Sequence, residues 1–353
     1  MQSILITGGA GFIGSHTCLS LLKKGYSLYV VDSFINSSKY SLINVLKILE
    51  IKNFDAKKLL NIFTGDITDQ RFLRDVFSKS IIDKKPIKSV IHFAGLKSVA
   101  ESVKYPILYW RSNLMASLSL IETMIEFNCL TLIFSSSATI YGLSNKNPIN
   151  EKANLKPLNP YGNTKFAIEN LLNDLFNSQK IKFKIANLRY FNPVGAHSSG
   201  LIGEDPKGIP NNIFPIISKV AIGKLSELKI YGNDWPTNDG TGVRDYIHVM
   251  DLAEGHIKTL EYLINNDSQL INLNLGTGIG TSVLELINTY QMVNKVKIPY
   301  QFVEKRKGDV AELVADNNSA KELIDWFPKK NLKDMCRDSF NWQVRNPNGF
   351  QVF

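Results

Sequence analysis

The chain has 353 residues, of which 44% are hydrophobic, so it can bury a large core spread over two lobes. Its formal charge of +9 would suit an anionic partner, but the basic residues are dispersed without a nucleic-acid-binding motif, so we expect no nucleic-acid partner. The three cysteines are scattered, which predicts a cytoplasmic protein without disulfides, and the histidines lack metal-ligand spacing, which predicts no metal site. The sequence contains no apolar run of about 18 residues, so we expect no membrane anchor.

The first predicted element is a strand over residues 4–6 that enters a glycine-rich turn. Gly8, Gly11 and Gly14 lead into a helix whose apolar periodicity continues to residue 24. In this context the backbone can approach a pyrophosphate closely, while the first N–H groups of the helix point at it. The turn therefore predicts a dinucleotide site, although a tight turn without a ligand would use the same glycines.

A second predicted strand, residues 28–31, ends at Asp32. An acidic side chain in this place pairs with the adenosine ribose hydroxyls and repels a 2′-phosphate. Ser33 and Phe34 follow, so no neighbouring arginine is available to bind that phosphate. The predicted cofactor is NAD rather than NADP.

Strands and helices continue to alternate, which predicts an α/β fold with a doubly wound parallel sheet of the Rossmann type. A strand over residues 61–64 precedes Asp66, which could contact the adenine or simply cap the next helix. Another strand, residues 90–93, ends in Ala94 and Gly95, whose small size lets the backbone pass close to the cofactor.

After a predicted helix over residues 112–128, a strand over 131–134 ends in three consecutive serines. The carboxyl end of such a strand faces the ligand crevice of the sheet. Ser137 is the candidate to hydrogen-bond the reacting oxygen, while one or two of the serines could belong to an ordinary polar turn.

Tyr161 and Lys165 stand four residues apart, on one face of a helix that Asn159 would cap and Pro160 would begin. The helix dipole and the lysine ammonium both favour a phenolate, so we expect a pKa of Tyr161 below the usual tyrosine value. The pair could then take a proton from an alcohol while hydride leaves the same carbon. An isolated pair of this kind is often a coincidence on a helix surface, and the NAD site is what argues for catalysis here.

The alternation of strands and helices stops near Asn192, in a loop rich in glycine and proline that continues to residue 210. We expect an NAD-binding domain over residues 1–191 and a smaller α/β substrate domain over 192–353. Residues 246–252 and 271–275, within the segment 243–275, are predicted to return to the NAD-binding sheet.

Several longer motifs, in order and in register, resemble one known family. They cover residues 7–17 around the glycine turn, 92–97, 135–142, 189–197, 208–212 and 239–251. The chain is similar, nearly from end to end, to the extended short-chain dehydrogenase/reductases, and within them to the NAD-dependent UDP-hexose 4-epimerases.

The resemblance implies roles for individual residues. It makes Tyr161 the base, with Lys165 lowering its pKa and Ser137 positioning the O4 of the sugar. Positions that look like the family's NAD contacts are Gly8, Gly11, Phe12, Ile13, Gly14, Asp32, Ser33, Asn36, Ser37, Asp66, Ile67, Phe93, Ala94, Gly95, Lys97, Asn113, Ser135, Tyr161, Lys165 and Phe191. Positions that look like its UDP-sugar contacts are Lys97, Ser137, Tyr161, Tyr190, Asn192, Asn211, Asn212, Tyr231, Arg244, Arg306, Asp309 and Leu313.

By the same resemblance, a tightly bound NAD accepts hydride from C4 of UDP-glucose or UDP-galactose and returns it to the other face of the 4-keto sugar. NAD would be reduced only transiently and would not need to leave. The family also implies a homodimer, formed by a four-helix bundle from the helix near residues 112–128 and the one that starts at Tyr161.

The same fold also serves other activities. Related dehydratases use an acidic pair directly after the catalytic serine or threonine, but here Ala138 and Thr139 stand in those places and neither can act as a general acid or base. A non-catalytic NAD-binding regulator would be expected to lose the base, which is intact. A simple net-oxidising dehydrogenase is not excluded by these residues, and the resemblance to epimerases argues against it.

Substrate choice depends on Leu313. In the family, a tyrosine at this position accompanies strict use of UDP-glucose and UDP-galactose, and a small residue accompanies acceptance of the N-acetylated sugars. Leucine fits neither pattern, so use of UDP-GlcNAc and UDP-GalNAc, in addition or as the main substrates, stays open.

Overall fold

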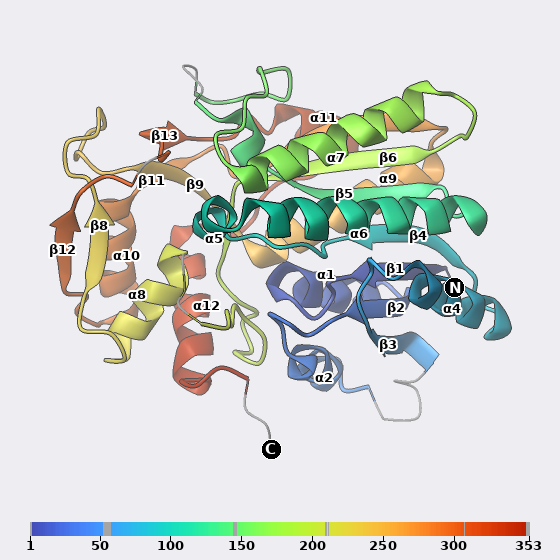
Figure 1. The fold of residues 1–353 in the computed structure, drawn as a ribbon. Coiled ribbons are helices and arrows are strands. Elements are labelled where there is room, and N and C mark those ends of the chain that lie inside the picture. The colour runs from blue at the N-terminus through green and yellow to red at the C-terminus, as the bar shows by residue number, and fades with distance from the viewer. Residues whose placement is uncertain are drawn as a thin grey trace.

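The structure, a computed structural model, describes residues 2–51, 58–143, 147–208, 210, 212–306 and 308–350 (Figure 1). One predicted substrate contact, Asn211, lies outside the described residues. The strands are β1 (Ser3–Thr7), β2 (Ser27–Asp32), β3 (Leu60–Thr64), β4 (Ile87–His92), β5 (Thr131–Ser137), β6 (Lys184–Tyr190), β7 (Asn192–Val194), β8 (Leu228–Tyr231), β9 (Val243–His248), β10 (Gln269–Leu275), β11 (Gly280–Ser282), β12 (Tyr300–Val303) and β13 (Glu312–Leu313).

The helices begin at Phe12 and alternate with the strands through the first half of the chain. They are α1 (Phe12–Lys23), α2 (Lys39–Ile48), α4 (Gln70–Ile82), α5 (Val99–Lys104), α6 (Pro106–Glu126), the 3-10 helix η1 (Ala138–Tyr141), α7 (Pro160–Asn177), α8 (Ile213–Ala221), α9 (Val249–Asn265), α10 (Val283–Asn294), α11 (Asn318–Ile324) and α12 (Leu332–Arg345). Helix α6 starts earlier than the predicted residue 112, because Pro106 suits the first helical turn.

In the described part of the chain, the large sheet has seven parallel strands in the order β10-β6-β5-β4-β1-β2-β3. Helices α4, α6 and α7 cover one face, and α1, α2 and α9 cover the other (Figure 1). Every residue of β1 and β2 is buried, as their uninterrupted apolar runs predict for strands covered on both faces. The predicted doubly wound α/β fold is confirmed. Strand order reverses between β1 and β4, so the ligand crevice lies beyond the carboxyl ends of these two strands.

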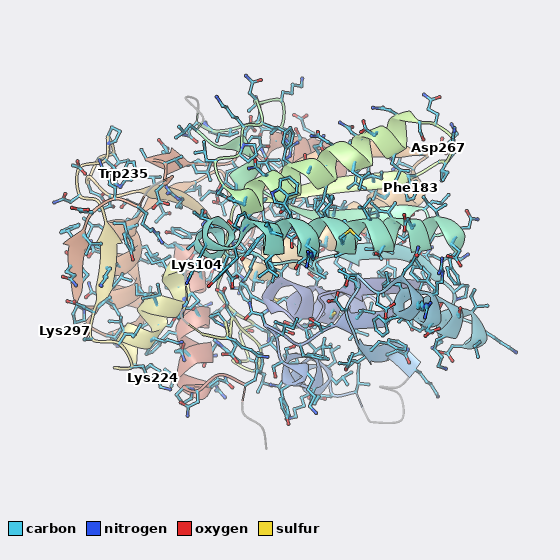
Figure 2. All side chains as sticks on the ribbon, in the orientation of Figure 1. Lys104, Phe183, Lys224, Trp235, Asp267 and Lys297 are labelled. Atoms are coloured by element: carbon cyan, nitrogen blue, oxygen red, sulfur yellow. The ribbon has the colours of Figure 1, made fainter. Side chains whose placement is uncertain are left out.

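The smaller lobe has its own core of Phe214, Ile230 and Tyr290, packed among α8, α10 and α12. Its sheets join β7, β9, β11 and β13 in one group and β8 with β12 in another. Figure 2 places Trp235 and Lys297 on this lobe, at the end of the molecule opposite Asp267. Among the residues described, none of the helices is both long and apolar enough to cross a lipid bilayer.

One of the two predicted returns to the large sheet is confirmed. Residues 271–275 lie in β10, at the edge of the large sheet beside β6. The prediction for residues 246–252 is wrong for residues 246–248, which belong to β9 in the smaller sheet, whereas residues 249–252 begin α9, which packs against β5 and β6 of the large sheet and against α1. An apolar run signals a buried strand, but it does not say which sheet buries it.

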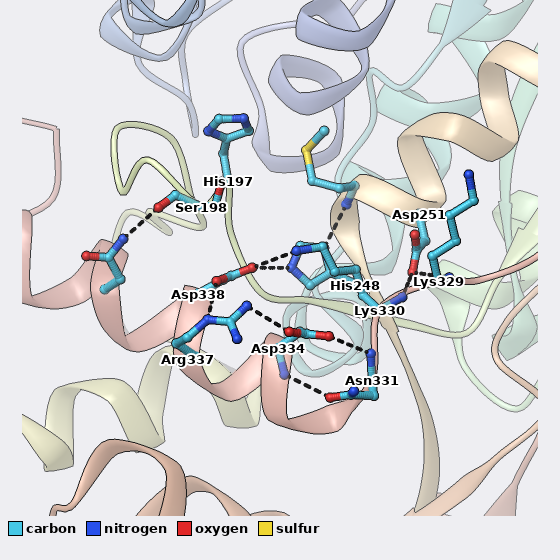
Figure 3. Close-up of polar contacts among 12 residues, drawn as sticks. His197, Ser198, His248, Asp251, Lys329, Lys330, Asn331, Asp334, Arg337 and Asp338 are labelled. Carbon is cyan, nitrogen blue, oxygen red and sulfur yellow. Dashed lines mark hydrogen bonds and ion pairs between the residues drawn. The ribbon is translucent and has the colours of Figure 1, made fainter.

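The two lobes are tied together where β9 passes into α9 (Figure 3). His248 Nε2 lies 3.2 Å from Asp338 Oδ2 on α12. Asp251 Oδ2 accepts hydrogen bonds from the backbone N–H groups of Lys329, at 3.0 Å, and Lys330, at 2.8 Å. These contacts hold α12 of the smaller lobe against a helix of the large sheet, which fixes both sides of the crevice.

Candidate active site

The turn between β1 and α1 has no room for side chains. Gly8 has φ +69°, and a Cβ added to it would lie 2.7 Å from the backbone nitrogen of Ala94. A Cβ on Gly14 would lie 2.4 Å from the carbonyl oxygen of Gly8. Within the described residues no side chain caps α1, whose N-cap is Gly11, so its first N–H groups face the crevice as an anion site requires. The turn fits the pyrophosphate of a dinucleotide.

Asp32 joins this turn to the loop after β2. Its Oδ2 accepts from the backbone N–H of Ala10 at 2.9 Å, and its Oδ1 accepts from Ser37 Oγ at 2.7 Å. The loop also contacts a lysine that the sequence did not place there, since Lys207 Nζ donates to the carbonyl of Phe34 at 2.6 Å. Ser33 and Asn36 are exposed on the same loop.

Asp66 does not cap the helix that follows β3. Asp69 does so, accepting from the backbone N–H of Arg71 at 2.9 Å, and Asp66 accepts from the N–H of Thr68 at 2.9 Å within the turn. The helix-cap alternative for Asp66 is therefore wrong. The carboxylate lies exposed at the carboxyl end of β3, where contact with the adenine stays a prediction.

All three serines at the end of β5 contact helix α7. Their partners are three α7 residues spaced one turn apart: the Ser135 carbonyl accepts from Lys165 Nζ at 2.6 Å, Ser136 Oγ donates to Glu169 Oε1 at 2.6 Å, and the Ser137 hydroxyl bonds the phenol of Tyr161. Ser135 and Ser136 do not belong to an ordinary polar turn, whereas Ser137 also caps the 3-10 helix η1. Strand β5 and helix α7 together position the proposed catalytic groups.

Ser137 is oriented by its neighbour Thr139. Its Oγ accepts from the backbone N–H of Thr139 at 3.2 Å and from the Thr139 hydroxyl at 3.0 Å. Both lone pairs are thus occupied, so the Ser137 proton can be donated onward to the Tyr161 oxygen or to a substrate oxygen. The Thr139 hydroxyl donates its proton to Ser137, which is a further argument against a role for Thr139 as an acid or base in a dehydration reaction.

Burial governs the ionisation of the tyrosine–lysine pair. It raises the pKa of Tyr161 to about 12, with the hydrogen bond from Ser137 working against it. It lowers the pKa of Lys165 to about 8, with the carboxylate of Glu169 working against it. The predicted lowering of the Tyr161 pKa is therefore wrong for the protein groups alone, because removing the phenol from water outweighs the hydrogen bond with Ser137. Lys165 Nζ lies 6.0 Å from the ring centroid of Tyr161.

Asn113 shapes the site through the loop after β4. Its Oδ1 accepts from the N–H of Leu96 at 2.8 Å, and its Nδ2 donates to the Leu96 carbonyl at 3.1 Å and to Thr164 Oγ1 at 3.0 Å. The buried amide is used fully between this loop and α7. Asn113 therefore holds this loop against α7, and its contact with NAD stays a prediction.

The predicted nucleotide-sugar residues come together from distant parts of the chain. The Arg306 guanidinium lies 4.1 Å from the ring centroid of Tyr231, and its Nε lies 3.2 Å from Asp309 Oδ2. Arg244 on β9 is adjacent in register to Leu313 on β13, and burial lowers the pKa of its guanidinium. Arg244 also interacts electrostatically with Arg306 and Asp309, so two arginines face one region, as binding a diphosphate requires.

Glu204, which no sequence motif indicates, forms hydrogen bonds with two of the predicted contact residues. Glu204 Oε1 accepts from Lys97 Nζ at 3.2 Å and from Asn212 Nδ2 at 3.0 Å. Lys97 follows β4 in the large lobe, whereas Asn212 begins α8 in the smaller one. Glu204 thus links the two sides of the crevice.

The residues predicted to bound the sugar lie near the carboxyl end of β5. Leu313 packs against a buried cluster that contains Ala138 and Phe191. Tyr190, at the end of β6, is buried and its hydroxyl lies 2.6 Å from His256 Nε2. Asn192 begins β7 and pairs with Tyr246 of β9. The structure therefore brings the predicted wall residue to the same place as the predicted hydroxyl donor.

The most informative residue missed from the sequence is Glu169. It stands four residues after Lys165, so the spacing that reveals the tyrosine–lysine pair also places Glu169 on the same helix face. Its partner, Arg189 on β6, could not be found by spacing, because the sheet topology alone brings the two together.

Comparisons with known proteins agree with this geometry. A family model described as GDP-mannose 4,6 dehydratase matches residues 5–339. The chain is 51% identical over 350 residues to the UDP-glucose 4-epimerase of Yersinia enterocolitica, and 46% identical over 350 residues to that of Bacillus subtilis, covering 99% of each chain in both comparisons. Among solved structures, the UDP-glucose 4-epimerase from Bifidobacterium longum in complex with NAD+ and UDP is 43% identical, with a TM-score of 0.91 over 99% of this chain and 100% of that one.

Proposed function

Because the chain belongs to the UDP-glucose 4-epimerase family of NAD-dependent enzymes, we propose that it interconverts UDP-glucose and UDP-galactose by oxidation and re-reduction at C4. The observation that carries this proposal is the contact of β5 with α7, which brings Ser137, Tyr161 and Lys165 together at the carboxyl end of the sheet. The glycine turn that fits a dinucleotide lies at the same end of the sheet.

In the proposed reaction, Tyr161 takes the proton from the 4-hydroxyl of the sugar and later returns it. Ser137 donates a hydrogen bond to the same oxygen, which holds O4 against the phenol. NAD, when bound, supplies the hydride acceptor and a positively charged ring that favours the phenolate. Lys165 adds a second positive charge beside the phenol and, through its bond to the Ser135 carbonyl, is held against the end of β5.

The 4-keto sugar must then present its other face, which requires tight binding of the nucleotide and weak binding of the hexose. Arg244, Arg306 and Asn212 are proposed to hold the UDP, and Tyr231 to lie beside the uracil. The hexose would turn in the space bounded by Ser137, Asn192 and Leu313. Their arrangement supports this division, because the two arginines lie on the smaller lobe while the proton-transfer groups lie on the large sheet.

The direct test is the product mixture formed from each UDP-sugar by the purified protein without added cofactor. UDP-glucose and UDP-galactose are each expected to give the same equilibrium mixture, as an enzyme with permanently bound NAD would produce. A requirement for stoichiometric NAD, or release of a ketone, would instead identify a net-oxidising dehydrogenase. A product lacking the elements of water would identify a dehydratase.

Leu313 is proposed to decide whether N-acetylated UDP-sugars are used as well. Leu313→Tyr should lower turnover of UDP-GlcNAc relative to UDP-glucose by about tenfold or more, because a larger side chain at one pocket wall removes space for the acetamido group. Competition between the two substrates measures the ratio. Leu323→Tyr, on the exposed side of α11, is the matched control; a ratio unchanged in Leu313→Tyr would remove this residue from substrate selection.

We also propose a homodimer formed by α6 and α7. These helices lie side by side on one face of the sheet (Figure 1), and α6 exposes the apolar side chains of Leu108, Met115 and Ile125. Met115→Lys should shift the protein toward monomer, because a charge would be buried in the interface. Sedimentation velocity measures the change. Met292→Lys on α10, also an exposed methionine, is the control, and a dimer unaffected by Met115→Lys would place the interface elsewhere.

The division at residue 192 and a cytoplasmic location complete the proposal. The separate core of the smaller lobe supports the division, although β10 belongs to the large sheet. Cys18, Cys129 and Cys336 are all buried and unpaired, which suits a reducing compartment.

A further inference from the structure

Behind Lys165 lies a buried ion pair that the proposed reaction does not use. Arg189 Nη2 lies 2.7 Å from Glu169 Oε2, and Arg189 Nε lies 3.1 Å from Glu169 Oε1. The two residues are 2% and 5% exposed, so the pair is almost completely removed from water. Such a pair is costly to bury, and a hydrophobic pair of the same size would often be as stable.

Both partners are fixed by further hydrogen bonds. Ser136 donates to Glu169, and Arg189 Nη1 donates to the Tyr141 hydroxyl at 3.0 Å and to the Glu151 carbonyl at 3.0 Å. Burial alone would lower the pKa of Arg189, but the hydrogen bonds and charges of Glu169 and Tyr141 together outweigh burial and raise the pKa. Arg189 is therefore permanently charged and cannot move away from Glu169 without losing several bonds.

Glu169 is also the acidic group that acts on Lys165 among the described residues. It lies one turn along α7, on the same helix face, and Lys165 is 4% exposed. In the part of the chain that the structure describes, the other groups around Lys165 carry no negative charge that could replace that of Glu169. His92 on β4 has a pKa lowered to about 3 by burial and by Lys165, so it is neutral.

On the remaining sides, the neighbours of Lys165 are uncharged or protonated. Strand β5 offers the Ser135 carbonyl and the ring of Phe134, whose centroid lies 4.7 Å from Nζ. Burial raises the pKa of Tyr190 on β6, and Tyr161 on α7 is the group that Lys165 is proposed to assist. The charge on Lys165 therefore depends on Glu169, and the influence of Glu169 depends on Arg189.

We propose that Glu169 is a positioning residue that keeps Lys165 charged beside Tyr161, and that Arg189 sets how much of the Glu169 charge reaches Lys165. The inference deepens the proposed function, since it rests on Tyr161 as the base. It assigns a purpose to the buried ion pair, namely adjustment of the pH at which Tyr161 ionises.

The test compares two variants that remove charges of opposite sign, and it measures the pH at which Tyr161 ionises in each. In Glu169→Gln, Arg189 and Lys165 repel each other, so Lys165 loses its proton at lower pH and Tyr161 should ionise about one pH unit higher. In Arg189→Met, the carboxylate acts on Lys165 without its partner, so Tyr161 should ionise at lower pH. In the double variant the two changes oppose each other, and ionisation should return close to that of the unaltered protein.

Ionisation of Tyr161 is measured by ultraviolet difference absorbance of the NAD-loaded protein, with the Tyr161→Phe variant as the baseline. Asp174→Asn, which removes an exposed carboxylate from the same helix, is the control and should leave the titration unchanged. Shifts in opposite directions for the two single variants would support the inference. Shifts in one common direction, or none, would show that the pair is merely structural.

This titration needs no sugar substrate, so it separates the inference from the proposed function. A protein that converts neither UDP-sugar refutes the epimerase proposal whatever the titration shows. A protein that converts both, with a titration indifferent to the pair, refutes the inference alone. If Glu169→Gln does not fold, Arg189→Met and the double variant still give the predicted order.

Discussion

Tyr161→Phe is expected to lower kcat by at least about a thousandfold, because proton transfer by a positioned side chain contributes that much and phenylalanine cannot accept a proton. The substitution removes one oxygen, so NAD content and UDP affinity should change little. Ser137 would lose its partner, but its hydroxyl can still donate to the sugar. Single-turnover kinetics with UDP-glucose, together with UDP titration, separate the two effects.

A matched control is Tyr300→Phe, which removes the same oxygen from a half-exposed residue on β12 and should keep full activity. Turnover by Tyr161→Phe within about tenfold of the unaltered protein would assign the base to another group. A parallel loss of UDP binding would show that the phenol supports the substrate site rather than the proton transfer.

The second large effect is expected on stability. Arg189→Met should lower the free energy of unfolding by about 3–5 kcal/mol, because it leaves the Glu169 carboxylate buried without its partner. The double variant Glu169→Gln/Arg189→Met should be less destabilised than Arg189→Met, since it leaves no unpaired charge. Urea unfolding of the NAD-loaded protein measures both.

An exposed ion pair gives the comparison for this prediction. Arg74 Nε lies 2.7 Å from Glu126 Oε2, with 44% and 45% of the two side chains exposed, so Arg74→Met should cost no more than about 1 kcal/mol. Equal losses for Arg74→Met and Arg189→Met would mean that burial does not set the cost of breaking these pairs.

Elements whose signal is local could be predicted from the sequence. The glycine turn, the acidic end of β2 and the capped start of α7 each depend on residues close together in the chain. Asn159 accepts from the N–H of Gly162 at 2.9 Å, as the expected N-cap does. The doubly wound parallel sheet is predicted by the alternation of strands and helices, whereas the order of its strands is seen only in the structure.

Properties that depend on the complete fold could not be predicted. The sequence shows that Tyr161 and Lys165 are neighbours, but not that the surrounding packing removes both from water, so it does not indicate that the pKa of Tyr161 is raised. Likewise, nothing in the local pattern of residues 243–248 distinguishes the small sheet from the large one. Glu204 and Lys207 reach the crevice through a long loop whose path only the fold defines.

The pairing of β13 with β9 gives the proposed substrate selection by Leu313 an unusual basis. Leu313 stands opposite Arg244 because the two strands run parallel in a fixed register. Adding or deleting one residue between Asp309 and Leu313 would turn the leucine to the other face of the strand, and the residue next to it would then take its place. The length of a short connection, as well as the identity of one amino acid, would then determine which hexoses are admitted, and variants with altered spacing could widen the range of sugars without touching the proton-transfer machinery.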